Sequence, residues 1–155
     1  MAGEIDGRLK ALGIDLPAPA KPVANYVPFV RTGNLVFISG QVTMSHGELR
    51  HVGKVGKEVN VEDAKKAARL CGINILSNLK AALDGDLDKV VRCVKLVGFV
   101  NAVENFTQQP EVVNGCSDLM VEVFGDKGRH ARSAVGSGSL PRNVAVEVEA
   151  IFEVA

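Results

Sequence analysis

Arg132 is one of two residues near the C-terminus whose types and surroundings are suited to chemistry. Its guanidinium group presents a planar fork that matches a carboxylate through two parallel, charge-assisted hydrogen bonds. The small residues Ala131 and Ala134 lie close to it in the chain and leave room for a ligand. The alternative is an ordinary strand arginine, either exposed or paired with Glu147.

Glu149 is the second residue of this kind. A partly buried carboxylate can have a raised pKa and exchange protons near neutral pH. Glu149 lies on the same strand face as Glu147 and Ile151, so part of its surroundings is apolar. The alternative is one of several surface carboxylates with no special role.

The stretch 144–154 positions Glu149, because its apolar residues alternate with the others in the period of a β-strand. A turn around 140–143 would let this strand run back beside a strand that contains Arg132. We therefore expect an arginine and a glutamate to lie near each other on one face of a sheet.

Upstream of this region, the chain alternates between strand and helix patterns. Strands are predicted at 26–30 and 35–39, joined by a turn at 32–34, and Gly40 then suggests a bulge. Apolar residues at helical spacing predict a helix over 61–83, with Asn60 as its N-cap, and a second helix from Pro110 to Gly125. The stretch 90–100 is a strand between them, and 45–59 is loop with a short strand.

This order, β-β-α-β-α-β-β, predicts a mixed sheet of the α+β class with both helices on one face. The strand at 90–100 is apolar on both faces, with Cys93, Val97 and Phe99 on one side and Leu96 and Val100 on the other. Two helices can cover only one face of a sheet. The apolar second face therefore indicates burial against another subunit.

The N-terminal part is expected to stand apart from this core. Apolar residues at helical spacing predict a short helix over 4–13, and the proline-rich stretch 16–22 reads as an extended linker. We therefore divide the chain into an N-terminal helix and linker, 1–21, and a main domain, 22–155.

Composition narrows the classes of function. The 155 residues carry 18 basic and 18 acidic side chains, with a sequence pI near 6.8, which argues against binding of nucleic acid. No apolar run is long enough for a membrane span, and we expect a cytoplasmic protein without a membrane partner. The three cysteines have no paired spacing and are expected to be buried and reduced.

Three further features bear on a site. Tyr26, the only tyrosine, could line a small pocket and supply one hydrogen bond, although a lone strand aromatic is more often packing. The three histidines fit no metal-ligand spacing, so we predict no metal site. The run Gly136-Ser137-Gly138-Ser139 is typical of a flexible or phosphate-binding loop but lacks the lysine and helix of a P-loop.

Several of these residues together resemble a known family. The run Arg132-Ser133-Ala134-Val135, the pair Leu140-Pro141 and the run 146–150 are similar to the C-terminal signature of the reactive-intermediate deaminase family, also called Rid or YjgF. Tyr26 and the run 39–41, Ser-Gly-Gln, extend the resemblance over residues 22–155. It implies a chorismate-mutase-like fold, a homotrimer with sites between subunits, and no cofactor.

The resemblance also implies roles for individual residues. Arg132 and the backbone N–H of Ala134 would bind the carboxylate of a small metabolite, with Asn114 near the same cleft. Glu149 and the carbonyl of Gly40 would orient a water molecule that attacks an imine carbon, and Tyr26 would line the wall. Many relatives have cysteine where this chain has Ala134, and bulkier residues than Gly136–Ser139, which widens the pocket rim here.

The implied reaction is hydrolysis of 2-imino or enamino acids to 2-oxo acids and ammonia, which needs orientation more than strong activation. The alternative from another class is a non-catalytic trimer that binds a small carboxylate metabolite at the same arginine. A third reading, ribonuclease activity, is disfavoured by the balanced charge.

Overall fold

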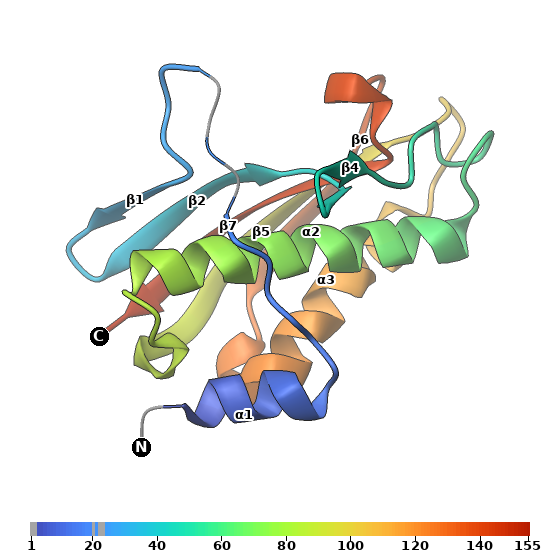
Figure 1. Ribbon diagram of the computed structural model, residues 1–155. Coiled ribbons are helices and arrows are strands. Elements are labelled where there is room, and N and C mark those ends of the chain that lie inside the picture. The colour runs from blue at the N-terminus through green and yellow to red at the C-terminus, as the bar shows by residue number, and fades with distance from the viewer. Residues whose placement is uncertain (1–2, 20, 22–23) are drawn as a thin grey trace.

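The computed structural model describes residues 3–19, 21 and 24–155, and the fold is a five-stranded mixed sheet with helices on one side (Figure 1). The strands are β1 (Phe29–Thr32), β2 (Leu35–Gln41), β5 (Val90–Asn101), β6 (Ala131–Ser137) and β7 (Val146–Val154). The helices are α1 (Glu4–Ala11), α2 (Val61–Ala82) and α3 (Gln109–Phe124). A two-stranded ribbon, β3 (Met44–Ser45) with β4 (Glu48–Leu49), completes the regular structure with three short 3₁₀ turns (Leu87–Lys89, Gly125–Gly128 and Pro141–Asn143).

The predicted element order is confirmed, and β3 and β4 lie at the start of the region expected to be loop with a short strand. The helix prediction at 61–83 is close to α2, and the side chain of Asn60 accepts a hydrogen bond from the Asp63 N–H at 2.8 Å. Such an N-cap stabilises a helix by about 1 kcal/mol. α3 begins with Pro110 in its first turn and ends at Gly125, as the sequence predicts.

The strand order is β1-β2-β7-β5-β6, and it corrects one prediction. β6 and β7 are not neighbours, because β5 lies between them, parallel to β6 and antiparallel to β7. The connection through α3 does join parallel neighbours, whereas α2 connects β2 to a strand two places away. A hydrophobic pattern determines which face of a strand is buried, but it carries no information about which strand lies next to it.

The hydrophobic core lies between the sheet and the layer of α2 and α3. Phe152 of β7 meets Phe124 of α3 edge to face, with 6.0 Å between ring centroids. α2 and α3 approach closely at Gly115, where an added Cβ would collide with the backbone carbonyl of Lys65. All three cysteines are buried, as predicted.

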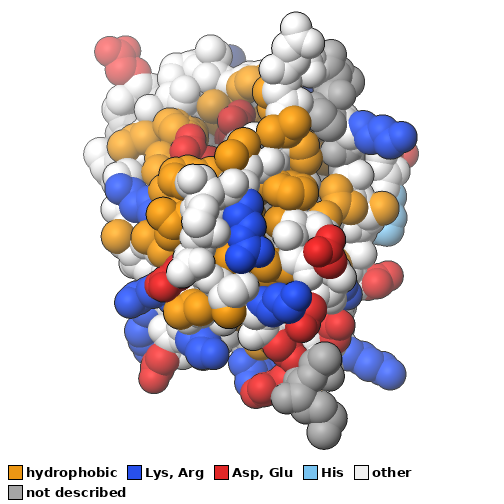
Figure 2. All heavy atoms as spheres, turned by 90° about the vertical axis from the view of Figure 1, so that its left-hand side faces the viewer, with side chains coloured by type: hydrophobic (Ala, Val, Ile, Leu, Met, Phe, Trp, Pro, Cys, Tyr) orange, Lys and Arg blue, Asp and Glu red, His pale blue; other side chains and the backbone are white. Residues whose placement is uncertain are grey.

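The opposite face of the sheet carries many apolar side chains, and no helix or strand of the described residues covers it. Figure 2, which views the side of the β1–β2 turn and the C-terminus, shows hydrophobic side chains gathered with acidic ones among them. The cross-strand register places the following apolar side chains on this open face: Val30, Phe37, Val97, Phe99, Val135 and Ile151. Phe37 is 41% exposed and Val135 43%. Cys93 is an exception to the predicted alternation, because a register shift between Cys93 and Lys95 turns it into the core.

α1 packs on this core, in contrast to the expectation of a separate N-terminal helix. Ile5 and Leu9 are buried, and Lys80 of α2 lies 3.1 Å from Asp6 in an ion pair. Ala20 and Pro22, in the predicted linker and at the predicted domain boundary, lie outside the described residues. Within the part of the chain that the structure describes, no helix combines the length and hydrophobicity needed to cross a bilayer.

Asp88 holds the first turn of α1 in place. Its carboxylate accepts hydrogen bonds from the N–H groups of Glu4 at 3.0 Å and Ile5 at 2.8 Å, because the N-cap Gly3 has no side chain to do so. The bond from Ile5 is the main cause that lowers the pKa of Asp88. The contribution of Asp88 to docking of α1 is therefore present above the ordinary carboxyl pKa and is lost as the pH falls through the lowered value.

We predict that Asp88→Ala releases α1 while leaving the rest of the fold intact. Hydrogen exchange at the Glu4 and Ile5 amides should accelerate several-fold, since those donors lose their acceptor. Asp84→Asn, four residues upstream, is the control and should leave these exchange rates unchanged. Equal exchange in Asp88→Ala and the wild type would show that other contacts fix α1.

Candidate functional site

Arg132 lies on β6, at the edge of the sheet, and its side chain is directed toward α3. Its Nη1 donates hydrogen bonds to Asn114 Oδ1 at 2.7 Å and to Ser117 Oγ at 3.2 Å. Arg132 and Asn114 are thus brought together, as the resemblance implies. Asn114 and Ser117 are one helical turn apart, so they lie on the same side of α3.

This arrangement leaves the binding edge of the guanidinium group available. The two hydrogens on Nη1 are both donated, whereas the structure shows no partner for Nε or Nη2 among the described residues. Nε–H and one Nη2–H point in the same direction and form the side-on fork that binds a carboxylate. No ion pair of the described residues includes Arg132, so the alternative of a structural pair with Glu147 does not hold in this chain.

Ala134 lies two residues further along the same edge strand. It is in register with Gly98 of β5, on the side of the sheet that faces α3, and therefore on the same face as Arg132. Gly98 leaves space at this point that Val113 of α3 fills, since a Cβ on Gly98 would collide with that side chain. Ala134 therefore lies close to Arg132 on the edge strand, and the donor role of its N–H stays a prediction.

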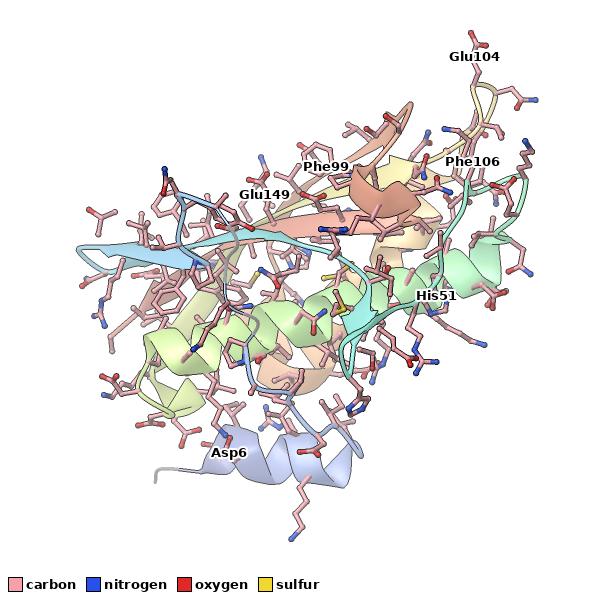
Figure 3. All side chains as sticks on the ribbon, turned by 45° about the horizontal axis from the view of Figure 1, so that its top comes forward. Asp6, His51, Phe99, Glu104, Phe106 and Glu149 are labelled. Carbon is pink, nitrogen blue, oxygen red and sulfur yellow. The ribbon has the colours of Figure 1, made fainter. Side chains whose placement is uncertain are left out.

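The two glutamates lie on the other face of the sheet. Glu147 is opposite Phe99, and Glu149 is opposite Val97, on the open apolar face. Arg132 is opposite the buried Leu96, on the helix-facing side. Figure 3 shows Glu149 and Phe99 on the side of the sheet away from α2. The prediction that an arginine and a glutamate share one sheet face is therefore wrong.

Glu147 is the carboxylate that packs against Gly40. A methyl group built on Gly40 would collide with the Glu147 Oε2, so only glycine allows this approach. The close approach occurs at the predicted bulge, where the β2–β7 register shifts between Ile38 and Gln41. The family resemblance implies Glu149 for the role beside Gly40, but Glu149 is more exposed and lies two residues further along β7.

The environment of Glu147 makes it the more unusual of the two acids. Burial is the larger cause that raises its pKa, and the negative charge of Glu149 raises it further. A carboxyl group with a raised pKa is a stronger base once ionised, which suits it to hold and polarise a water molecule.

Tyr26 and Gly40 line the same pocket, which has a volume of about 610 Å³. The pocket lies between the chain that precedes β1, the end of β2, the β3–β4 ribbon and α2. Ser39 holds the Tyr26 segment to β2, because its N–H donates to the Pro28 carbonyl and its hydroxyl to the Val27 carbonyl. Tyr26 is 54% exposed, so its ring is available to a ligand or to a second chain. Arg132, Ala134 and Asn114 are not part of the pocket lining.

The loop Gly136–Ser139 is held in place by side chains. Lys54 Nζ donates to the Gly138 carbonyl and, at 3.0 Å, to the Oδ1 of the fully buried Asn101. The Ser137 hydroxyl also donates to the Ser139 carbonyl at 2.9 Å. These hydrogen bonds hold the loop in one conformation without bulky side chains, and the expected widening of the pocket rim stays a prediction.

Two residues that are not predicted from the sequence, His130 and Ser117, also lie beside the site. His130 Nε2 lies 2.8 Å from Ser117 Oγ, and Ser117 in turn contacts Arg132. Ser117 could have been predicted from its spacing, because it lies three residues after Asn114 and therefore on the same side of α3. Among residues 3–19, 21 and 24–155, no three His, Cys, Asp or Glu side chains are grouped as metal ligands.

Comparison with known proteins places this geometry in a family. Residues 6–154 match the family described as "YjgF/chorismate_mutase-like, putative endoribonuclease". The chain is 45% identical to Protein TCP17 of Trypanosoma cruzi over 153 residues, covering 98% of this chain and 95% of that protein. It is 30% identical over 138 residues to a 2-iminobutanoate/2-iminopropanoate deaminase of Dermatophagoides farinae, covering 89% and 92% of the two chains.

The fold has close counterparts among solved structures. The protein Atu1372 of Agrobacterium tumefaciens, described as having unknown function, shares 51% sequence identity and superposes with a TM-score of 0.92, covering 97% of this chain and 92% of that one. The family match spans almost the whole chain, including most of α1. The chain therefore belongs to the YjgF family, the family of the reactive-intermediate deaminases.

Proposed function

We propose that this protein hydrolyses 2-imino acids to 2-oxo acids and ammonia in clefts formed between copies of the chain. The observation that carries the proposal is the position of Arg132 and Glu147 on opposite faces of one sheet. The two groups can act on one small molecule only when one copy supplies the arginine and another supplies the glutamate. The relative named a 2-iminobutanoate/2-iminopropanoate deaminase supports this choice of reaction.

The residues then have distinct roles. The Nε and Nη2 edge of Arg132, with the N–H of Ala134, binds the substrate carboxylate, and Asn114 fixes the guanidinium. Glu147 and the carbonyl of Gly40 orient a water molecule whose oxygen attacks the imine carbon. Glu147 takes a proton from the water as its oxygen bonds to carbon, and the π electrons of the C=N bond move to the nitrogen, which takes up a proton. The resulting carbinolamine then loses ammonia, while its hydroxyl group gives up its proton and becomes the ketone oxygen. Orientation of two bound reactants is the main source of the acceleration.

The open face supplies the surface for assembly. Its apolar side chains are exposed in the single chain, and a partner that covers them gains hydrophobic stabilisation. The contact joins the β6 edge of one copy to the glutamate-bearing face of the next, so the two surfaces differ. Such a head-to-tail contact forms a ring when its rotation closes, and we propose that three copies close it as a homotrimer.

We predict that Arg132→Ala lowers the acceleration of imine hydrolysis on the order of 100-fold, because two charge-assisted hydrogen bonds to the substrate are lost. Arg132→Lys should retain part of the activity, since an ammonium group keeps the charge but not the fork. The measurement is loss of a 2-imino acid generated in situ by an amino-acid oxidase. Arg129→Ala, three residues upstream and exposed, is the control.

An Arg132→Ala protein that is folded and fully active would overturn the role of this arginine. RNA cleavage without any effect on the imine would instead favour the activity in the family description.

The second prediction distinguishes the two glutamates. Glu147→Gln should lose turnover by about 100-fold or more while still binding a 2-oxo acid, because an amide cannot accept the proton of water. Since burial and Glu149 raise the pKa of Glu147, the wild-type rate should fall on acidification at a higher pH than an ordinary glutamate gives. Glu149→Gln removes the neighbouring negative charge, so the pKa of Glu147 falls and the acid limb should move to lower pH. The measurement is the pH dependence of kcat/KM for each variant.

The opposite result, an active Glu147→Gln and an inactive Glu149→Gln, would return the role to Glu149. An acid limb that does not move in Glu149→Gln would show that Glu147 does not control it.

The third prediction concerns the sharing of sites between chains. Arg132→Ala and Glu147→Gln chains, each inactive alone, should recover activity when produced together, with about a quarter of the sites holding both native groups after random assembly. As a control, a chain with both substitutions is produced together with the wild type. Shared sites then give about a quarter of the activity, whereas sites within one chain give about a half. No recovery in the first mixture would rule out sites that combine the two chains.

The alternative function is binding of a small carboxylate metabolite without catalysis. The unused Nε and Nη2 edge of Arg132 would serve it equally well. Binding of 2-oxo acids that depends on Arg132, without any effect of the protein on imine decay, would select this function.

A further inference from the structure

His130 stands at the end of a chain of hydrogen bonds that leads to Arg132. The ring lies just before β6, with Nδ1 2.6 Å from the Gly128 carbonyl and Nε2 2.8 Å from the Ser117 hydroxyl. Ser117 Oγ lies 3.2 Å from Arg132 Nη1. Three elements thus meet around the ring: the turn at Gly128, α3 and β6.

The partners determine where each proton lies. The Gly128 carbonyl can only accept, so His130 Nδ1 carries a hydrogen and donates it. Arg132 can only donate, so the Ser117 oxygen accepts from Nη1 and its own hydrogen is free to be donated elsewhere. In neutral His130, Nε2 has a lone pair and accepts that hydrogen. Each donor in this series of hydrogen bonds, from Arg132 through Ser117 to His130 and Gly128, then has one acceptor.

The charge state of the ring agrees with this pattern. Burial is the largest cause that lowers the pKa of His130, and the positive charge of Arg132 lowers it further, while the bond to Gly128 opposes both. Arg132, from β6, is the charged side chain that acts on the ring; α3 presents the Ser117 hydroxyl and the turn a carbonyl. The neutral form is the one that completes the hydrogen bonds to Arg132.

We propose that His130 is a positioning residue for the carboxylate clamp: neutral His130 orients the Ser117 hydroxyl, which holds Arg132 Nη1 so that the Nε and Nη2 edge faces the substrate. This inference rests on the proposed function for its effect on activity. Asn114 and Ser117 together accept both hydrogens of Nη1, and loss of either acceptor frees the guanidinium to rotate. An untethered arginine loses conformational entropy when it binds, which weakens binding.

Two substitutions of His130 distinguish its hydrogen bond to Gly128 from its hydrogen bond to Ser117. In His130→Gln the amide oxygen can reach the place of Nε2 and accept from Ser117. In His130→Asn the shorter amide can reach only the Gly128 carbonyl. We expect His130→Asn to raise KM for the imine about 3- to 10-fold with little change in kcat, because the clamp binds substrate and transition state equally. His130→Gln should stay within about twofold of the wild type.

A double-substitution cycle tests whether the effect passes through Ser117. Ser117→Ala should raise KM by a similar factor, and His130→Asn should add nothing in that background, because the connecting hydroxyl is already gone. Arg129→Gln, the exposed neighbour of His130, is the control and should leave KM unchanged. Effects of His130→Asn and Ser117→Ala that multiply would overturn the proposal.

A measurement without substrate keeps this inference separate from the proposed function. The ¹⁵N and ¹H signals of the Arg132 guanidinium report whether it rotates. Separate Nη1 and Nη2 signals are expected in the wild type and in His130→Gln, and averaged signals in His130→Asn and Ser117→Ala. Identical signals in all four proteins would overturn the positioning role. Distinct signals in a protein that neither binds 2-oxo acids nor hydrolyses imines would uphold the positioning and refute the proposed function.

Discussion

The fold depends on the position of β7 between β2 and β5, with antiparallel pairing on both sides. Its period-two alternation sends Val146, Val148 and Phe152 into the core and directs Glu147 and Glu149 to the open face. A shift by one residue would bury two carboxylates and expose the core of the sheet, so the register is strongly determined. The bulge that brings Gly40 close to Glu147 is a shift in the pairing of β2 with β7.

Separation of the two charged groups follows from the same position. β5 occupies the place between β6 and β7, so the arginine strand becomes an edge and its side chain turns to α3. The single chain thereby presents a cation on one surface and carboxylates on another, among exposed apolar side chains. Both parts of the proposed site are incomplete alone, and assembly would complete both at once.

Much of this arrangement can be read from the sequence, and the remainder has identifiable physical reasons. Helix and strand periods predict the element order, because each is a local pattern. The proximity of Asn114 to Arg132, eighteen residues apart, is instead what the family resemblance implies. The position of β5 is not local, since no residue in β6 or β7 specifies its neighbour. The sequence also does not show which of Glu147 and Glu149 lies beside Gly40. Both point to the same face of β7, and only the bulge at Gly40 distinguishes them. The contact of His130 with Ser117 joins residues thirteen apart and has no sequence period.

The neutral partners of Arg132 have a consequence for the medium in which the protein works. Asn114 and Ser117 orient the guanidinium without neutralising its positive charge, and among the described residues no carboxylate pairs with it that a ligand would have to displace. The same openness admits any small anion, and chloride or phosphate would compete for the Nε and Nη2 edge. If this edge binds a carboxylate metabolite as proposed, its occupancy would depend on the other anions in solution as well as on the metabolite concentration.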